Sequence, residues 1–505
     1  MKRLLLGLLI FSAIFAQNKK IVVRTDPRIE LLGVVEYLAQ NSNSNQLSQI
    51  YSPENKYAKS IEDKFGKYRE HKAIQTFKKL RKSCNKRDAI QKIFLHLTNP
   101  PELKVEYPID EIAAEFGDSS KYFEKNIQNW LVDLRDFARK SEFMKFYESN
   151  KEFYEKITSP ISNVLASDDI CGRLEKFFGE KKSSYTVILS PILTGGFGEQ
   201  IDDDKLYAVI GPAEIEDNIP HFCIHRTPIF VSELFAYYFV KPVVDANWQK
   251  FAKSARLLEP LNSYFSFFDS WKDAVYYHLE KIAVYAIEQD KFHKELNILS
   301  NIKFGFQYLL EIEDLIDNKY LLNRDKYQKF SDFASQIANR LTEIAQIPEK
   351  DFKDRLSARI TSKTTDLWIL AEQECKKLTF SDIMALTAMD MQSYLKQAEH
   401  TFQCFLDAQG ENNEHYWFVK YQLGKIKYQL DDLNSAEKIF NQYIKSNPDG
   451  NMVAGAFWRL GQIKERKGDY KQAEQLYRHA IKLDPNLLQA KQSLNSLLEK
   501  MKKEK

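Results

Sequence analysis

Two stretches near the C-terminus decide how this part of the chain folds: QLGKIKYQLDDLNSAEKIFNQYIKSNP at residues 422–448 and RLGQIKERKGDYKQAEQLYRHAIKLDP at residues 459–485. Each stretch holds a Leu-Gly pair, then an Ala 12 residues after the Gly, then a Pro 12 residues after the Ala. The same residue types at the same offsets indicate an internal repeat, which is the most specific architectural signal in the chain.

The spacing resembles the tetratricopeptide repeat, a unit of about 34 residues. In that family small residues let two antiparallel helices approach, and Pro ends the pair. An earlier stretch, YLKQAEHTFQCFLDAQG, keeps Ala398 and Phe402 but has no Leu-Gly pair, so we interpret it as a degenerate copy. Leu487–Met501 is predicted to be a capping helix, since terminal repeats need a polar outer face. We therefore predict an α-helical solenoid over residues 378–505.

The resemblance also predicts a binding surface. Stacked helix pairs form a superhelix with a concave side, and in tetratricopeptide domains the first helix of each pair lines it. Six residues of these first helices are predicted to face a partner: Tyr421, Lys425, Tyr428, Trp458, Gln462 and Glu465. Rings mixed with charges favour a peptide or protein partner over DNA. Packing between repeats is the alternative role of the aromatic residues.

Composition limits what the rest of the chain can be. At 505 residues it has the length of two to four domains. Gly (17) and Pro (15) are scarce, which predicts long helices and short connections. The net charge of +3 indicates no strongly basic surface, so we expect no nucleic-acid partner. The five Cys are scattered and odd in number, and we interpret them as buried thiols, although export would permit pairing.

Residues 1–16, MKRLLLGLLIFSAIFA, have the pattern of a secretory signal peptide. Lys2 and Arg3 precede an apolar run, and the small residue Ala16 stands before Gln17. The run is shorter than the ~18–20 residues that span a bilayer, which favours cleavage over a permanent anchor. We therefore predict an exported protein, periplasmic or extracellular, with no membrane span after cleavage.

Residues 17–290 are predicted to form an α+β domain, mostly helical with a small sheet. SYTVILSPIL (184–193) and KLYAVIGPAEI (205–215) are rich in β-branched residues and bounded by Pro, Gly and Asp, as strands are. The segment between them, TGGFGEQIDDD, is predicted to be a loop or hairpin. Residues 291–377 show helical spacing and are predicted to be a helical linker or subdomain.

These stretches, together with DFARKSEFMKFYESNKEFYEKI (136–157), resemble a family of exported bacterial domains of unknown function. The resemblance implies a zincin-like, zinc-dependent peptidase domain of the gluzincin kind, in which a helix after the sheet reads approximately HEFSHSFVNP. In this chain the corresponding segment is ELFAYYFVKP, residues 233–242. The tetratricopeptide part lies outside this resemblance.

The zinc-binding motif is missing from that segment. In one register Glu233 and Tyr237 stand at the two His positions, with Leu234 at the position of the general base. In a register shifted by one, Glu233 remains the base, but Ser232 and Ala236 replace the His residues. Two His four residues apart hold zinc, and the Glu activates its water. Neither register leaves HExxH, so we predict no catalytic residue, metal ligand or cofactor here.

A relocated metal site is the alternative. In HFCIH three ligand-type residues alternate, and a strand would place them on one face. A later helix adds a His and a Glu near where a gluzincin has its third ligand. The five residues are His221, Cys223, His225, His278 and Glu280.

The leading hypothesis from sequence is thus an exported, non-catalytic interaction or scaffold protein. Its repeats would bind a peptide or protein, beside a peptidase-like domain that has lost its zinc site. The alternative is a divergent zinc metallopeptidase with relocated ligands.

Overall fold

The computed structural model describes residues 21–40, 49–51, 55–83, 87–114, 120–202, 204–216, 218–224, 226–262, 268–447, 450 and 452–503. The predicted signal peptide, residues 1–16, lies outside the described residues, as do His225 and Pro448. The described part is mostly helical with a small sheet and C-terminal helical hairpins, which confirms the α+β class.

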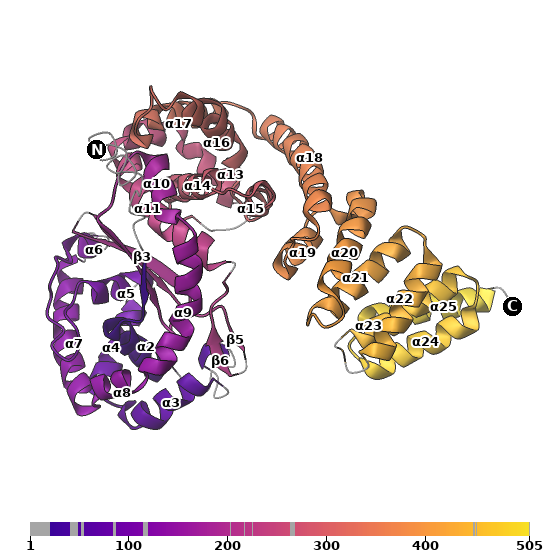
Figure 1. Ribbon diagram of the computed structural model, residues 1–505, viewed down its shortest axis with the longest axis horizontal. Coiled ribbons are helices and arrows are strands. Elements are labelled where there is room, and N and C mark those ends of the chain that lie inside the picture. Colours follow the sequence, from indigo (N-terminus) through magenta and orange to yellow (C-terminus); the bar gives the residue numbers. More distant parts are fainter. Residues whose placement is uncertain are drawn as a thin grey trace, which may run out of the picture. The chain divides into compact units, whose positions relative to one another are not determined.

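The chain forms two compact units (Figure 1). The N-terminal unit comprises Met1–Ile287 and Tyr308–Gln346, and the repeat unit comprises Glu288–Gln307 and Ile347–Lys505. The region 291–377, predicted as one linker or subdomain, is therefore divided between the two units. The region is helical, as its spacing predicts, but some of its helices pack in the N-terminal unit and others in the repeat unit.

The elements of the N-terminal unit follow in chain order. The strands are β1 (Val22–Arg24), β2 (Ser184–Leu189), β3 (Gly196–Ile201), β4 (Lys205–Ile210), β5 (Glu214–Glu216) and β6 (Ile219–His221). The helices are α2 (Pro27–Ala39), α3 (Lys56–Phe65), α4 (Lys72–Ser83), α5 (Arg87–Leu95), α6 (Asp110–Ala114), α7 (Ser120–Lys140), α8 (Phe143–Ser149), α9 (Lys151–Ser167), α10 (Ile170–Phe178), α11 (Thr227–Ala246), α12 (Trp248–Phe251), α13 (Leu258–Asn262), α14 (Trp271–Ala286), α16 (Leu309–Leu315) and α17 (Phe330–Ile344).

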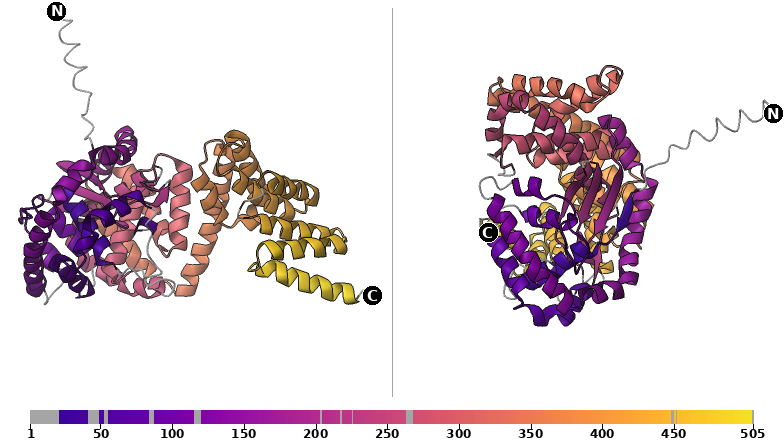
Figure 2. Two further views of the ribbon diagram at one scale, coloured as in Figure 1. Left: turned by 90° about the horizontal axis from the view of Figure 1, so that it is seen from below. Right: turned by 90° about the vertical axis from the view of Figure 1, so that its left-hand side faces the viewer.

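The main sheet has the order β1-β2-β4-β3, in which β1, β2 and β4 are parallel and β3 is antiparallel to β4. The two predicted strands are confirmed as β2 and β4, and the segment between them folds back as β3. Val187, Ile188 and Leu189 of β2 are all buried, as expected of a strand covered on both faces. Helices lie on both sides of the strands (Figure 2), among them α9 against β1 and α11 against β3 and β4.

The start of helix α2 is set by local sequence. Asp26 is its N-cap and accepts a hydrogen bond from the Arg28 backbone N–H at 3.0 Å, and Pro27 occupies the first turn. The Arg28 guanidinium closes back on the Asp26 carboxylate at 2.8 Å. Nearly all of α2 is buried, so this helix forms the centre of the N-terminal unit.

The repeat unit contains α15 (Lys291–Lys303), α18 (Glu349–Glu374), α19 (Phe380–Thr387), α20 (Leu395–Gln409), α21 (Tyr416–Gln429), α22 (Leu433–Ser446), α23 (Val453–Arg466), α24 (Tyr470–Leu483) and α25 (Leu488–Lys503). From α20 onward each helix packs against the next. A Cβ built on Gly461 would lie 2.4 Å from a ring carbon of Tyr477, so the Leu-Gly pair does mark a close helix contact. The predicted capping helix is α25.

A disulfide joins Cys375, just after α18, to Cys404 in α20. The interpretation of the Cys residues as free thiols is therefore wrong for this pair. Cys171 is buried, as expected, and Cys223 is half-buried, and neither belongs to a disulfide.

Candidate functional site

The predicted zinc-motif positions lie on α11, and their side chains are engaged elsewhere. Glu233 Oε1 lies 2.6 Å from Lys281 Nζ on α14, so the carboxylate is neutralised by an ammonium group. Ser232 donates its hydroxyl to the Pro228 carbonyl one turn earlier at 2.8 Å. Ala236 is buried and carries no ligand atom. The set does not fit zinc, which takes imidazole, thiolate or free carboxylate ligands.

Those residues of the relocated site that the structure describes do not converge either. The relocated site would need a strand through HFCIH, but β6 ends at His221 and Cys223 lies beyond it. His221 Nδ1 lies 3.5 Å from Glu214 Oε1 on β5. No group of three or more His, Cys, Asp or Glu within the described ranges could hold a metal ion.

His278 and Glu280 are both buried in α14. Burial lowers the pKa of His278 to about 4, and its Nδ1 lies 2.7 Å from the Ala274 carbonyl. Burial also raises the pKa of Glu280, with a further contribution from the Glu233 carboxylate. A neutral imidazole and a carboxyl group that favours its proton are typical of interior packing.

The N-terminal unit has a polar cavity of about 620 Å³ beside α11. Its lining includes Lys92, His96, Glu199, Tyr237, Tyr238 and Asp245. Tyr237, at one of the expected His positions, therefore opens onto this cavity. His96 Nε2 lies 3.5 Å from Glu199 Oε1 of β3, which is the closest pairing of an imidazole with a carboxylate in the lining.

A glycine sets how closely α11 approaches the sheet at this cavity. A Cβ on Gly198 of β3 would lie 2.9 Å from the Tyr238 ring. The Tyr238 hydroxyl donates to the Gly198 carbonyl at 2.5 Å. The segment 194–204, predicted to be a loop or hairpin, thus forms part of the cavity wall through Glu199 and its neighbours. Within it Gly195 (φ 81°) and Asp202 (φ 51°) have a positive φ.

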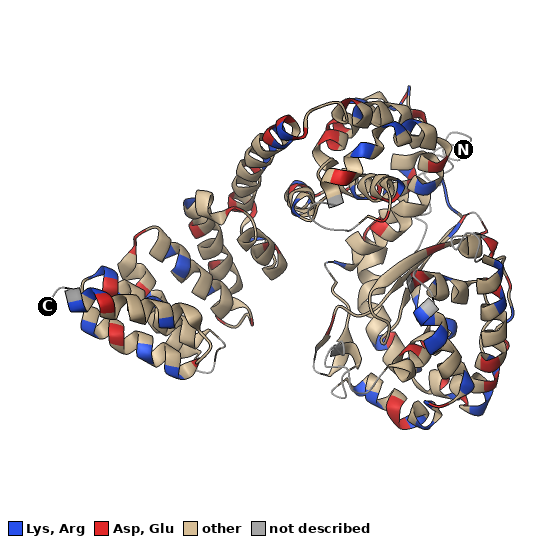
Figure 3. Cartoon of the chain, turned by 180° about the vertical axis from the view of Figure 1, so that it is seen from behind, with Lys and Arg blue, Asp and Glu red and all other residues tan. Residues whose placement is uncertain are grey.

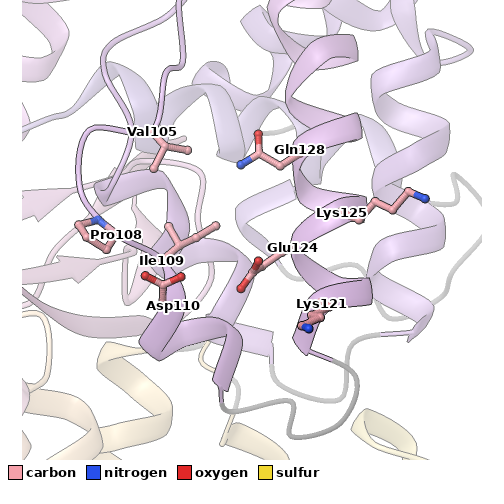
Figure 4. Close-up of a pocket in the computed structure, with 8 residues that line it drawn as sticks. All are labelled: Val105, Pro108, Ile109, Asp110, Lys121, Glu124, Lys125 and Gln128. Carbon is pink, nitrogen blue, oxygen red and sulfur yellow. The ribbon is translucent and has the colours of Figure 1, made fainter.

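A neighbouring pocket of about 440 Å³ lies between α6 and α7 and shares Pro108 and Asp110 with the cavity. Figure 4 shows Asp110 of α6 and Glu124 of α7 on opposite sides of it, with Lys121, Lys125 and Gln128 along α7. Its lining mixes both signs of charge and contains no imidazole, thiol or hydroxyl.

In the repeat unit, three of the six predicted partner residues line one pocket. Tyr428, Gln462 and Glu465 face a pocket of about 490 Å³, which is closed by Tyr477 of α24 and by α25. Glu465 Oε2 accepts a hydrogen bond from the Tyr477 hydroxyl at 2.7 Å. Lys425 is half-buried and donates to Gln422 Oε1 at 2.8 Å.

The other two aromatic residues pack inside the repeats. Tyr421 is buried, and its ring lies 5.5 Å from those of Phe440 and Tyr443. Trp458 packs against the cluster between α24 and α25, and its Nε1 donates to Ser493 Oγ at 2.9 Å. For both, the packing alternative describes the structure better than an open binding face.

Sequence reasoning missed Arg459 and Arg466, which flank this pocket. The Arg466 guanidinium lies over the Tyr428 ring at 4.3 Å, and Arg459 approaches the same ring at 5.7 Å. Their spacing with Gln462 is i, i+3, i+7, so helical periodicity could have placed all three on one face. Figure 3 shows both signs of charge interspersed over these helices, so total charge does not single these residues out.

Comparison with known proteins assigns both parts of the chain. A family model described as Domain of unknown function (DUF4932) matches residues 21–339, and one described as Tetratricopeptide repeat matches residues 419–449 and 454–487. No curated protein and no solved structure matches the chain. The predicted repeats and the predicted family of unknown function are confirmed, but the match carries no gluzincin link. Among the described helices, none combines the length and apolarity needed to cross a membrane.

Proposed function

The chain belongs to the DUF4932 family and also carries tetratricopeptide repeats, and from this premise we propose an exported, non-catalytic protein that binds a protein or peptide through its repeats. The observation that carries the proposal is the pocket lined by Tyr428, Gln462 and Glu465. Three predicted partner residues from two repeats meet there, although 37 positions separate Tyr428 from Glu465.

The repeat geometry supports binding. Stacked helix pairs present an extended surface whose backbone is already ordered, so little conformational entropy is lost when a partner docks. Amide, carboxylate and aromatic groups on one surface suit a peptide, which offers backbone hydrogen bonds and side chains together.

We propose that the domain lacks peptidase chemistry because of the side chains that α11 carries at the zinc-motif positions. A zincin needs two imidazoles and a carboxylate that is free to activate water. At these positions Glu233 is paired with Lys281, and the Ser232 hydroxyl donates to a backbone carbonyl one turn earlier in the helix. Tyr237, at the remaining position, lines the cavity. We propose that the domain keeps a peptidase-like framework without its metal chemistry.

Export is supported by two independent features. Residues 1–16 have the order of a signal peptide. The Cys375–Cys404 disulfide is of the kind that persists in oxidising compartments such as the periplasm.

Site-specific crosslinking in the native host tests the binding function. A photo-reactive phenylalanine at position 462 should form a discrete crosslinked band, whose partner mass spectrometry then identifies. The same probe at Lys445, exposed on α22, is the matched control and should give none. Equal crosslinking at both positions, or none at position 462, would contradict the proposal.

Elemental analysis tests the alternative function. About one zinc per chain after dialysis, reduced in a His278→Ala or Glu280→Gln variant, would establish a relocated metal site. We expect no such zinc, because the candidate ligands within the described residues form no group of three that could hold a metal ion.

A further inference from the structure

A buried imidazole in the wall of the cavity beside α11 lacks hydrogen bonds. His96 lines this cavity and is 7% exposed, and no group in the described part of the chain hydrogen-bonds to either of its ring nitrogens. Its Nε2 lies 3.5 Å from Glu199 Oε1, which is longer than the ~2.7–3.2 Å of an N–H···O hydrogen bond. Buried polar groups are normally paired, because an unpaired one costs free energy. The two nitrogens therefore suit a polar ligand inside the cavity.

The positions of both side chains are fixed by the backbone around them. His96 follows α5, and its carbonyl accepts hydrogen bonds from the N–H groups of Glu106 at 2.8 Å and Tyr107 at 3.2 Å. Glu199 lies within β3, opposite Tyr207 of β4. Groups that are held in place before a ligand arrives lose little conformational entropy on binding, so this pair is preorganised.

The acids of the lining differ in whether a cation is paired with them. Asp202 and Asp245 each lie within 3.4 Å of a lysine Nζ. Lys92 of the lining lies 3.0 Å from a carboxylate outside the cavity. Among the residues that the structure describes, no Lys or Arg forms an ion pair with Glu199 or Asp110. The cavity therefore keeps two carboxylates that can accept hydrogen bonds and that disfavour an anion.

We propose that this cavity binds a neutral polyhydroxylated ligand, a short saccharide, one hydroxyl of which lies between His96 and Glu199. A hydroxyl both donates and accepts, so it can donate to the carboxylate and accept from an imidazole N–H. An anion would be repelled by the two unpaired acids. An ammonium group only donates and would leave the imidazole N–H without an acceptor. This inference concerns the N-terminal unit and is independent of the binding function proposed for the repeats.

The rest of the lining suits a sugar ring. Tyr107 and Tyr237 contribute aromatic rings, and Ile112 and Pro242 contribute aliphatic surface. Such surfaces pack against the C–H faces of a sugar, while its hydroxyls bind the polar groups of the same wall. The volume of about 620 Å³ lies within the ~300–1,000 Å³ typical of small-molecule sites.

Saturation-transfer difference NMR with the full chain tests this proposal. The probes are cellobiose, maltose and N,N′-diacetylchitobiose, each titrated to give a Kd, with putrescine and malonate as a dication and a dianion. We expect at least one disaccharide to bind and neither ion to displace it. In Glu199→Gln the affinity for that disaccharide should fall about tenfold, because a charged acceptor is lost. Glu152→Gln, which changes an exposed acid on α9, is the matched control and should change the affinity less than twofold.

A second variant separates binding from folding. His96→Phe keeps a ring at this position and removes both unpaired nitrogens, so the affinity should fall about tenfold while the melting temperature stays equal or rises. His400→Phe, at an exposed position of α20, is its control and should leave the affinity unchanged.

Three outcomes would overturn the proposal. The first is that none of the disaccharides binds, in which case His96 and Glu199 face only water. The second is that putrescine or malonate displaces the disaccharide or binds more tightly than it does. The third is that Glu199→Gln binds the disaccharide with the wild-type affinity, and this outcome remains readable even if His96→Phe does not fold. Crosslinking at position 462 is unaffected by any of these results, so the function proposed for the repeats is tested separately.

Discussion

Glu30 is a carboxyl group completely enclosed in the N-terminal unit. Its Oε2 accepts a hydrogen bond from the Tyr57 hydroxyl at 2.7 Å, and Tyr57 in turn meets the Tyr154 hydroxyl at 2.7 Å. Burial raises the pKa of Glu30 to about 7, and the Asp26 carboxylate adds to the effect. The sequence alone places Glu30 in the first turn of a helix, where an exposed acid would be ordinary.

This burial predicts a pH-dependent stability. Between the ordinary pKa of 4.5 and about 7, the folded chain binds more protons at Glu30 than the unfolded chain does. The free energy of unfolding therefore falls as pH rises through this window, by about 3 kcal/mol in total. Glu30→Gln mimics the protonated group, so the difference in urea midpoint between pH 5 and pH 8 should shrink. Glu152→Gln, an exposed acid on α9, should keep the wild-type difference, and an unchanged slope in Glu30→Gln would refute the assignment.

At the scale of helices and strands, local patterns predicted the elements, but contacts distant in sequence were not predictable. The Leu-Gly and Ala spacing predicted α21 to α24 because each pair is a local unit. The role of Gly198 depends on Tyr238, 40 residues later, and no spacing rule links the two. The repeat pattern leaves both a partner-facing and a packing role open for Trp458, because it does not contain Ser493 of the capping helix, to which the indole donates.

The contact between α23 and α24 predicts the effect of enlarging Gly461. In Gly461→Leu the side chain would enter the Tyr477 ring, whose Cδ1 lies 2.5 Å from the position of a Cβ. Overpacking of this kind costs at least about 1–3 kcal/mol, so the repeat unit should melt at a lower temperature. Gln475→Leu adds the same side chain at an exposed position of α24 and is expected to leave the melting temperature nearly unchanged. Equal stability of the two variants would show that α23 and α24 separate readily.

The contact between α23 and α25 predicts that Trp458 stabilises the repeat unit. Trp458→Ala removes packing against the Leu497 cluster and the hydrogen bond to Ser493, at a cost of about 2 kcal/mol. Thermal unfolding of the full chain should show this loss, whereas Gln462→Ala at the pocket should not. A melting temperature unaffected by Trp458→Ala would restore the role on the binding face that the repeat spacing predicts.

For the whole molecule, sequence predicted which kinds of domain are present better than how their helices are grouped. The helices within 291–377 looked continuous because helical periodicity does not reveal which core a helix joins. Phe292 and Leu299 of α15 pack with Trp368 of α18 in the repeat unit, whereas Phe330 of α17 belongs to the N-terminal unit. The disulfide was unpredictable for the same reason, since it depends on α18 and α20 packing together across a separation of 29 residues.

The disulfide relates the fold of the chain to the compartment in which the chain folds. A closed loop of this length stabilises a folded protein by about 3.5 kcal/mol in the chain-entropy account, and such bonds form and persist in oxidising environments, in keeping with the proposed export. Chain exported by its native host should therefore start at Gln17 and yield a Cys375–Cys404 linked peptide in a non-reducing digest. A variant lacking residues 2–16, retained in the cytoplasm, should have both thiols open to alkylation and a repeat unit that melts at a lower temperature. Cys223→Ser, which leaves the pair intact, should not alter that difference. Alkylation of both Cys375 and Cys404 in the exported chain would refute the linkage, because the oxidising environment would then have been available and the bond still not formed.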